Sequence, residues 1–395
     1  MKRTITCGLV FVMLAMASGC MGPTKKGKEA REKANRHFNQ VRSRIDYDQA
    51  MQAFNRGQML QARRLLDTAM KKSPDEALYA VLLGRICLET SQMENAIAAF
   101  DQAAQLDEQM PDPRYYLGIA AERMKDSEEA AKHYLEAYEL DGESPQYLTA
   151  AAEVLISEGR LAEAETILSR DMDRFRNNAA MHHLRGRIAM MNGKWTNAVD
   201  CLRRASLIDD QDDLLLADYA RAQLAAGHHA SCMQTLAQIE ARDESNFSKT
   251  DLNRLRIRCL VDSRRYKEAH RELCAYTSQH PDDVDAWIDL GLVCRSIGDN
   301  RRLQKAGHRL TLLDRDRFEG YFLLGCAFLE VEAYDKAIEF FSESAKIAPE
   351  RSETWLALGM SYEKSGELVK AFRAYARADN DHGRMLMTQV ADDME

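Results

Sequence analysis

Nine cysteines and two histidine doublets are the side chains of this sequence best suited to chemistry. Because neighbours on a helix point about 100° apart, His182-His183 and His228-His229 do not form chelating i, i+4 pairs. Seven cysteines follow Cys20, and none forms a Cys-x-x-Cys pair: Cys87, Cys201, Cys232, Cys259, Cys274, Cys294 and Cys326. These residues therefore predict no metal site.

The other polar residues also lack a catalytic arrangement. The sequence has no glycine-rich phosphate loop and no nucleophile elbow. Its many carboxylates belong by default to solvated helix faces. The odd number of later cysteines predicts at least one free thiol. The sequence does not decide whether Cys259 and Cys274 form a disulfide. We expect no enzyme and no cofactor, and cysteines that serve as small packing residues.

A 34-residue repeat supplies the elements that would position any site. Between Phe318 and Met385 it occurs twice, first as Tyr321, Leu324, Gly325, Phe328, Tyr334, Ala337, Phe341 and Pro349, then as Trp355, Leu358, Gly359, Tyr362, Gly366, Ala371, Tyr375 and Ala378. Apolar residues at i, i+3, i+4 and i+7 form one stripe on a helix. Two stripes with a turn between them predict an antiparallel helix pair, and small residues let the two helices approach closely.

The pattern resembles the tetratricopeptide repeat, or TPR. Every step between copies is 34 residues except that from Asp213 to Thr250, which is 37. The copies start at Ser43, Ala77, Pro111, Pro145, Ala179, Asp213, Thr250, Val284, Phe318 and Ser352. One hairpin cannot bury its own apolar face, so neighbours must stack. The resemblance implies an all-α, right-handed α-solenoid of about ten TPR helix hairpins.

The first twenty residues are expected to be a targeting segment. A basic start precedes an apolar stretch at 5–17 that is too short for an ordinary membrane span. It ends in Ala17-Ser18-Gly19-Cys20, which resembles the lipobox of bacterial lipoproteins, whose cysteine is acylated, for example with palmitate. The alternative is an ordinary cleaved signal peptide. The resemblance implies a lipid anchor at Cys20 and, because Met21 follows, an outer-membrane lipoprotein facing the periplasm.

The rest of the chain divides into four predicted segments. Residues 21–42 form a basic tether in which Gly22, Pro23 and Gly27 interrupt regular structure. Repeats 1–6 occupy 43–246 and repeats 7–10 occupy 247–385, with an acidic tail at 386–395 that forms a polar cap or a frayed end. Three extra residues near 242–248 predict a hinge, or alternatively a tolerated surface insertion.

In TPR solenoids, the first helix of each hairpin, helix A, lines the concave groove. By resemblance, the ninth residue of helix A points into it and is an arginine in four copies: Arg85, Arg187, Arg221 and Arg258. Nearby fall His183, Arg254 and Arg295, and the last two copies offer Phe322 and Leu356. Glu122, Glu153, Glu330 and Glu363 are expected to face inward as well. A basic stripe would suit an acidic or C-terminal carboxylate partner. The alternative is that these arginines pair with acids of the adjacent repeat.

We therefore expect a non-catalytic protein–protein interaction scaffold of the bacterial cell envelope, acting in pilus or secretion machinery or in outer-membrane assembly. The alternative is an adaptor or regulator of a cell-wall (murein) enzyme. A formal charge of −8 gives no reason to expect a nucleic-acid partner.

Replacing Cys20 tests the anchor. Cys20→Ser should leave an uncleaved precursor or a protein without acyl chains, because the acylated thiol is gone. Intact-mass measurement and membrane fractionation check this outcome. An unchanged mass and unchanged fractionation would contradict lipidation at this residue.

Overall fold

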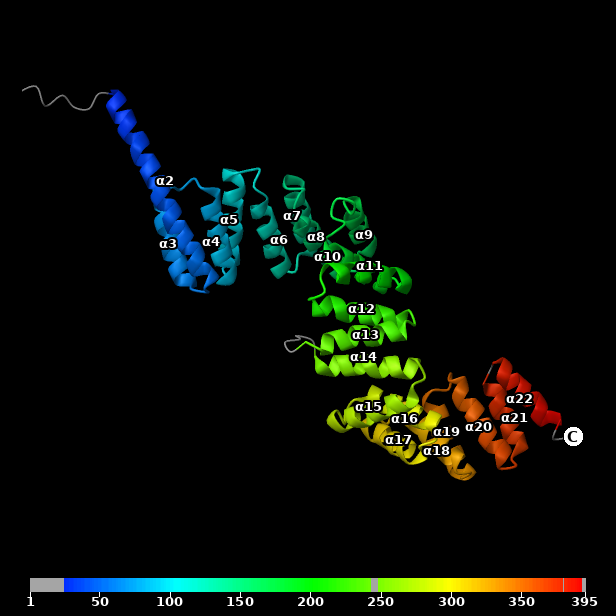
Figure 1. Cartoon of the computed structure of the whole chain (residues 1–395). Helices are drawn as coiled ribbons and strands as arrows, with labels where there is room; N and C mark the ends of the chain where they lie inside the picture. Colours follow the sequence, from blue (N-terminus) through cyan, green and yellow to red (C-terminus); the bar gives the residue numbers. More distant parts are fainter. Residues whose placement is uncertain (1–24, 243–247, 379, 393–395) are drawn as a thin grey trace, which may run out of the picture. The chain divides into compact units, whose positions relative to one another are not determined.

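The computed structural model describes residues 25–242, 248–378 and 380–392 as α-helices joined by short turns (Figure 1). Within these residues there are 21 helices and no strand, which confirms the predicted all-α class. Contacts divide the chain into two compact units, one ending at Ile188 and one beginning at Ala189. We call them the N-terminal unit and the C-terminal unit. The predicted signal peptide and Cys20 lie outside the described residues.

The N-terminal unit contains four and a half helix pairs. Its helices are α2 (Lys25–Asn55), α3 (Met59–Lys72), α4 (Ala77–Glu89), α5 (Met93–Leu106), α6 (Pro111–Arg123), α7 (Ser127–Leu140), α8 (Pro145–Ser157), α9 (Leu161–Arg170) and the first part of α10 (Ala179–Met191).

The C-terminal unit continues the alternation. Its helices are α11 (Trp195–Ile208), α12 (Asp213–Ala225), α13 (His229–Glu240), α14 (Lys249–Asp262), α15 (Tyr266–Gln279), α16 (Val284–Ile297), α17 (Asn300–Leu313), α18 (Phe318–Glu330), α19 (Tyr334–Ile347), α20 (Ser352–Lys364), α21 (Leu368–Arg377) and α22 (Asp381–Asp392).

The predicted repeat frame agrees with the helix boundaries. Eight of the predicted starts, from Ala77 to Ser352, are the first residues of α4, α6, α8, α10, α12, α16, α18 and α20. The start predicted at Thr250 falls one residue inside α14, and Ser43 lies within the long helix α2.

The turn inside every hairpin contains one residue in the left-handed backbone region. These residues are Gly57, Ser91, Lys125, Gly159, Gly193, Gly227, Arg264, Gly298, Glu332 and Gly366. A left-handed residue ends a helix and redirects the chain, and glycine adopts it without the cost that a Cβ atom brings. The turn predicted around Gly366 is therefore present, and it recurs in all ten hairpins.

Four hairpins close where helix A presents a glycine to an aromatic ring of helix B. A Cβ atom on Gly118 would lie 2.5 Å from the Tyr134 ring, and one on Gly359 would lie 2.5 Å from the Tyr375 ring. The same contact joins Gly84 to Phe100 and Gly325 to Phe341. The four aromatic side chains are at most 1% exposed, so the glycine provides the space in which each ring is buried.

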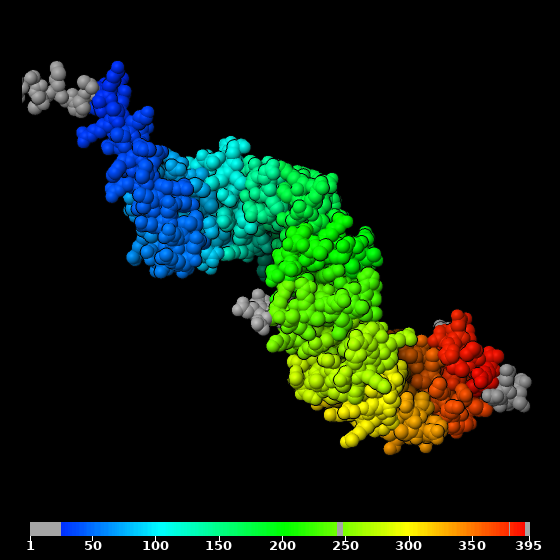
Figure 2. All heavy atoms as spheres, viewed as in Figure 1, coloured from blue at the N-terminus to red at the C-terminus, as the bar shows by residue number. Residues whose placement is uncertain are grey.

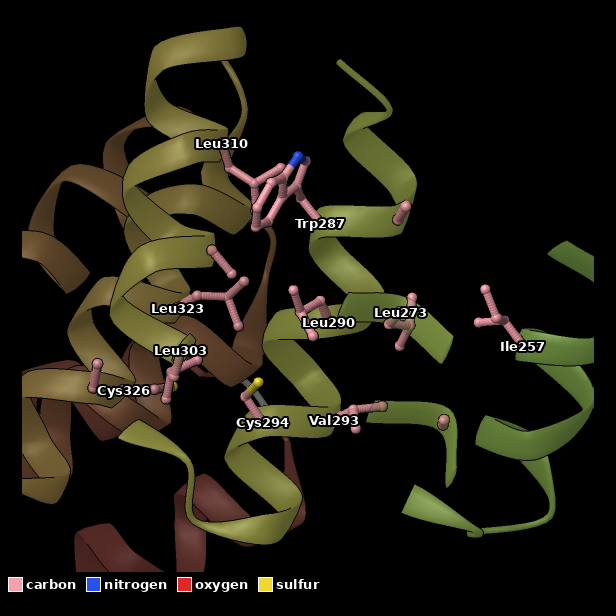
Figure 3. Packing of buried hydrophobic residues seen from close by; sticks show 14 of the residues in the cluster. Ile257, Leu273, Trp287, Leu290, Val293, Cys294, Leu303, Leu310, Leu323 and Cys326 are labelled. Carbon is pink, nitrogen blue, oxygen red and sulfur yellow. The ribbon is translucent and has the colours of Figure 1, made fainter. Parts of the chain in front are cut away.

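Apolar residues of neighbouring repeats form continuous clusters within each unit. In the C-terminal unit, Figure 3 shows Trp287 and Leu290 of α16 close to Leu310 of α17 and Leu323 of α18. The Trp287 indole N–H donates to the carbonyl oxygen of Pro281 at 2.8 Å, and Trp355 bonds Pro349 in the same way at 2.8 Å. Each tryptophan thus ties its helix to the end of the preceding hairpin.

One expectation about the chain ends is wrong, and one of the two alternatives for the tail is excluded. Gly27 does not interrupt the tether but lies inside α2, whose exposed first part projects beyond the packed helices of its unit (Figure 2). The described part of the tail is not frayed, because α22 continues to Asp392 and buries Val390 against Ala371 and Tyr375.

The predicted hinge and the observed division of the chain lie at different places. The hinge predicted near 242–248 falls partly outside the described residues and stays a prediction. The observed division into units lies within α10. No helix in the described ranges is both long and apolar enough to cross a membrane.

Enlarging Gly359 tests the glycine–aromatic contact. Gly359→Leu should destabilise the last hairpin by about 1–3 kcal/mol, because the new side chain must displace the Tyr375 ring. Met360→Leu is the matched control, since Met360 lies next in α20 and is 46% exposed. In a repeat protein the loss stays near its origin. Hydrogen exchange should show weakening in α20–α22, and equal weakening in α3–α7 would contradict the repeat account.

Candidate partner-binding surfaces

Arg85 lies in a hollow of about 440 Å³ between α2, α4 and α6. Its guanidinium carbon is 4.6 Å from the centre of the Phe54 ring and 5.3 Å from that of Tyr116. Cation–π contacts of this kind orient a guanidinium, and Arg85 Nη1 also donates to Met51 Sδ at 3.9 Å. Met59 and Ile119 add apolar lining to the same hollow. The ion pair of Arg123 with Glu89, at 3.0 Å, lines it as well. This surface therefore combines an oriented cation, an ion pair and apolar walls.

Arg187 and His183, both on α10, face an acidic neighbour. Partial burial raises the pKa of Glu153 on α8, the nearby Arg187 and His183 offset part of the rise, and Glu122 adds to it. All four side chains are thus close enough to interact. The structure brings the predicted basic residues together with predicted acidic ones, so this part of helix A carries both signs of charge.

Two of the glutamates predicted to face the groove bind inside their own hairpins. The Tyr134 hydroxyl donates to Glu122 Oε2 at 2.6 Å, and the Tyr375 hydroxyl donates to Glu363 Oε2 at 2.7 Å. Burial of the ring and the bond to Glu122 raise the pKa of Tyr134. These carboxylates hold the aromatic rings that the glycines accept, which is a structural role that the repeat pattern did not reveal.

Arg221 of α12 is held by an acid of its own helix. Its Nη1 donates to Oδ1 of the buried Asp218 at 2.5 Å. This partner lies three residues earlier, not in the adjacent repeat. Arg221 is half-buried, and the bond to Asp218 orients its guanidinium.

Arg254 and Arg258 line a second hollow, of about 320 Å³, between α14 and α16. Arg254 forms ion pairs with Asp283, the N-cap of α16, at 3.7 Å and with Asp285 of the next repeat at 3.6 Å. Arg254 thus follows the alternative in which the arginines pair with acids of the adjacent repeat. Partial burial raises the pKa of Asp289 in the same hollow, and the nearby Arg258 offsets part of the rise. The lining contains both charges and the apolar Ile257 and Ile288.

The last predicted residues contribute to packing. Arg295 lies over the Phe322 ring at 5.8 Å and donates to Cys326 Sγ at 3.7 Å. Phe322 itself packs against Phe341, with ring centres 5.7 Å apart. Leu356 contacts the cluster of Ala371, Tyr375 and Val390. The structure does not bring Phe322 and Leu356 into one apolar patch among the contacts that it describes.

The sequence analysis missed the aromatic residues around Arg85. Phe54 is the twelfth residue of the first copy, a position that the TPR resemblance places in the groove, so the sequence could have predicted it. Tyr116 is the sixth residue of its copy, which the resemblance does not place in the groove, so the sequence could not have predicted it. Their stacking against Arg85 depends on the spacing of α2, α4 and α6, the first helices of three consecutive repeats, which the repeat frame alone does not give.

The cysteines and histidine doublets behave largely as predicted. The seven later cysteines are free thiols, so Cys259 and Cys274 are not bridged here. Cys259 donates from Sγ to the carbonyl oxygen of His229 at 3.3 Å. His182 is buried and its Nε2 bonds the carbonyl oxygen of Arg176 at 2.8 Å.

Stacked helix pairs of 34 residues with a small-residue contact in each define a helical repeat protein. Profiles described as tetratricopeptide repeat match residues 47–111, 121–188 and 318–351. The chain is a tetratricopeptide repeat protein, and its fold is an all-α solenoid of TPR hairpins.

Comparison with individual proteins gives more distant similarities. Human cilia- and flagella-associated protein 70 is 26% identical over 113 residues, 28% of this chain and 10% of that protein. The match thus spans about a tenth of that relative's length. A tetratricopeptide repeat protein of Parabacteroides merdae is 14% identical with a TM-score of 0.45, over 64% of this chain and 99% of that one. PilW, a widely conserved type IV pilus biogenesis factor, is 17% identical with a TM-score of 0.46, over 54% and 97%.

Asp289 gives a pH-dependent prediction. Its pKa is raised in the folded protein, so folding loses stability as pH rises from the ordinary aspartate value of 3.8 through the folded value, and stays lower above it. Asp289→Asn should therefore be more stable than wild type at pH 7, with the difference disappearing below about pH 3.8. Urea unfolding across pH measures this. A less stable variant at pH 7 would mean that attraction to Arg258 outweighs the cost of burial.

Proposed function

We propose that this protein is a non-catalytic scaffold of the bacterial cell envelope that binds protein partners on the helix-A face of its repeats. TPR repeats are protein-interaction modules, and the matches to the family support that part directly. The observation that carries the site is the hollow around Arg85, where two aromatic rings hold a half-buried cation.

The chemistry of this hollow suits a peptide. Arginine and aromatic residues are enriched at the points that dominate protein–protein binding energy. Arg85 can pair with a carboxylate, and its stacked guanidinium loses little freedom when it does so. Phe54, Tyr116 and Ile119 can cover an adjacent apolar side chain. The ligand of this hollow is therefore a segment with an acidic residue, or a C-terminal carboxylate, beside an apolar residue.

The hollow around Arg254 and Arg258 suits a different segment. Its arginines are accompanied by Asp285 and Asp289, so it offers both charges over a short distance. A partner that carries acidic and basic residues in alternation would complement it. Each unit is thus proposed to bind its own segment, and neither hollow depends on the other.

The envelope location rests on the N-terminal sequence. The lipobox-like end at Cys20 supports a lipid anchor, and Met21 supports the outer membrane with the body facing the periplasm. The exposed start of α2 carries six basic residues: Lys25, Lys26, Lys28, Arg31, Lys33 and Arg36. Each such residue near an anionic membrane surface contributes about 1 kcal/mol of attraction. In this setting we propose a role in pilus, secretion or outer-membrane assembly.

Affinity isolation from solubilised envelopes tests the assignment. Recovery of secretin, pilus or outer-membrane assembly subunits supports the proposal. Recovery of murein hydrolases supports instead the alternative of a cell-wall enzyme adaptor. A protein that resides in the cytoplasm without acyl chains would contradict the envelope assignment. It would not affect the proposed binding of a partner in the hollow around Arg85, which needs its own test.

Charge reversal at Arg85 tests the hollow. Arg85→Glu should weaken binding of a recovered partner about tenfold, or about 1.4 kcal/mol, because it removes the cation and repels an acidic segment. The matched control is Arg203→Glu with Arg204→Glu, two exposed residues of α11. Titration calorimetry at two salt concentrations measures both, since salt screens exposed charges and largely removes their interaction beyond about 10 Å at 0.1 M. Equal affinities for Arg85→Glu and the control would remove Arg85 from the site.

A further inference from the structure

Four side chains that bind metals in other proteins come together in the C-terminal unit. His270 and Cys274 lie one turn apart on α15, Cys294 lies in the last turn of α16, and Asp299 is the N-cap of α17. The three helices are consecutive and belong to repeats 7 and 8. Figure 3 shows Cys294 on α16 among the apolar residues of the largest cluster.

The distances fit a small ion. His270 Nε2 lies 3.3 Å from Asp299 Oδ2 and 3.7 Å from Cys274 Sγ. One ligand atom each from His270, Cys294 and Asp299 lie within 4.8 Å of one another. A tetrahedral zinc ion with bonds of about 2.0–2.3 Å holds its ligand atoms about 3.3–3.8 Å apart. The two shorter distances already have this length. Cys294 lies within 4.8 Å of His270 and Asp299, and Cys274 is placed by its distance to His270, so both thiols would have to move toward the ion.

We propose that His270, Cys274, Cys294 and Asp299 form a binding site for Zn²⁺. Thiolate, imidazole and carboxylate are the three ligand types that zinc takes in proteins, and four of them complete its usual coordination. Calcium and magnesium require mostly oxygen ligands, so two sulfur atoms and a nitrogen exclude them.

The surroundings suit a structural site. Cys294 is fully buried, and the side chains of His270 and Asp299 are 16% and 22% exposed. Two thiolates and one carboxylate bring three negative charges, of which zinc neutralises two. Arg302 Nη1, 2.7 Å from Asp299 Oδ2, is placed to balance the third. Asp299 Oδ1 accepts from the Arg302 backbone N–H at 3.1 Å, so one oxygen caps α17 while the other faces His270.

The proposed ion would lie where the packing of repeat 8 differs from that of other repeats. Repeat 8 lacks the aromatic ring that closes other hairpins, and Leu323 and Leu324 of the next repeat cover its Gly291 and Gly307 instead. Zinc would join α15 to both helices of this repeat. It would therefore stabilise both the junction between repeats 7 and 8 and the pairing of α16 with α17, where the glycine–aromatic contact is absent.

Metal binding by the purified protein tests the site. After chelator treatment and dialysis against Zn²⁺, the wild type should retain one zinc ion per chain at the site. Co²⁺ in its place should give the visible spectrum of a tetrahedral ion with sulfur-to-metal charge transfer. Cys294→Ser and His270→Ala should weaken Zn²⁺ binding at least tenfold and reduce or abolish that spectrum. Zinc should also slow hydrogen exchange in α15–α17 of the wild type but not of these two variants.

Two controls separate the site from general thiol and histidine binding. Cys201→Ser and His280→Ala alter a thiol and an imidazole outside the cluster, so they should bind zinc as the wild type does. Asp299→Asn keeps a good N-cap and should still weaken binding. The proposal is overturned if Cys294→Ser and His270→Ala bind as tightly as the controls. It is also overturned if Cys274 and Cys294 prove to be joined by a disulfide in protein purified without reductant.

Discussion

The contact between a glycine of helix A and an aromatic ring of helix B is the constraint on which four of the hairpins depend. Gly118 and Gly359 leave the space that Tyr134 and Tyr375 occupy, and the tyrosine hydroxyls then bond Glu122 and Glu363 one turn further along helix A. Ring, glycine and carboxylate thus fix the distance and the rotation of the two helices together. Any larger residue at the glycine would have to push the helices apart.

This constraint also decides which side chains are available to partners. Once the small-residue side of helix A is pressed against helix B, the ninth residue of the helix is left on another face. Arg85 and Arg258 lie there, in hollows of their own units, and Arg254 lies one turn before Arg258 in the same hollow. Their surroundings differ, because Arg85 is held by two rings and Arg254 by two carboxylates. The same fold therefore presents different binding chemistry in different repeats.

Much of the fold could be predicted from the sequence, because the 34-residue period ties helix starts, turns and small residues to fixed positions. The starts at Ala77 and Ser352 and the turn at Gly366 followed from that period. The end of the chain did not, since α22 has no repeat pattern and its burial of Val390 depends on the face that the last hairpin leaves open.

The candidate sites were predictable only in part. The period placed Arg85 and Arg258 on helix A. Their neighbours come from other helices, and the local sequence pattern does not predict which of these side chains will be in contact. The i, i+4 pair of His270 and Cys274 was visible in the sequence as one face of a helix. Its meaning emerges only when the fold places Cys294 and Asp299 beside it.

Site-specific photo-crosslinking tests the central claim, that partners bind on the helix-A face. A crosslinking amino acid is placed at position 55, where the exposed Asn55 of α2 lines the hollow around Arg85, in one sample and at position 203, on the exposed face of α11, in another. The account predicts that one partner protein is captured from position 55 and that the same protein is not captured from position 203. Capture of that partner from position 203 alone would contradict the account, because it would place the binding surface on helix B.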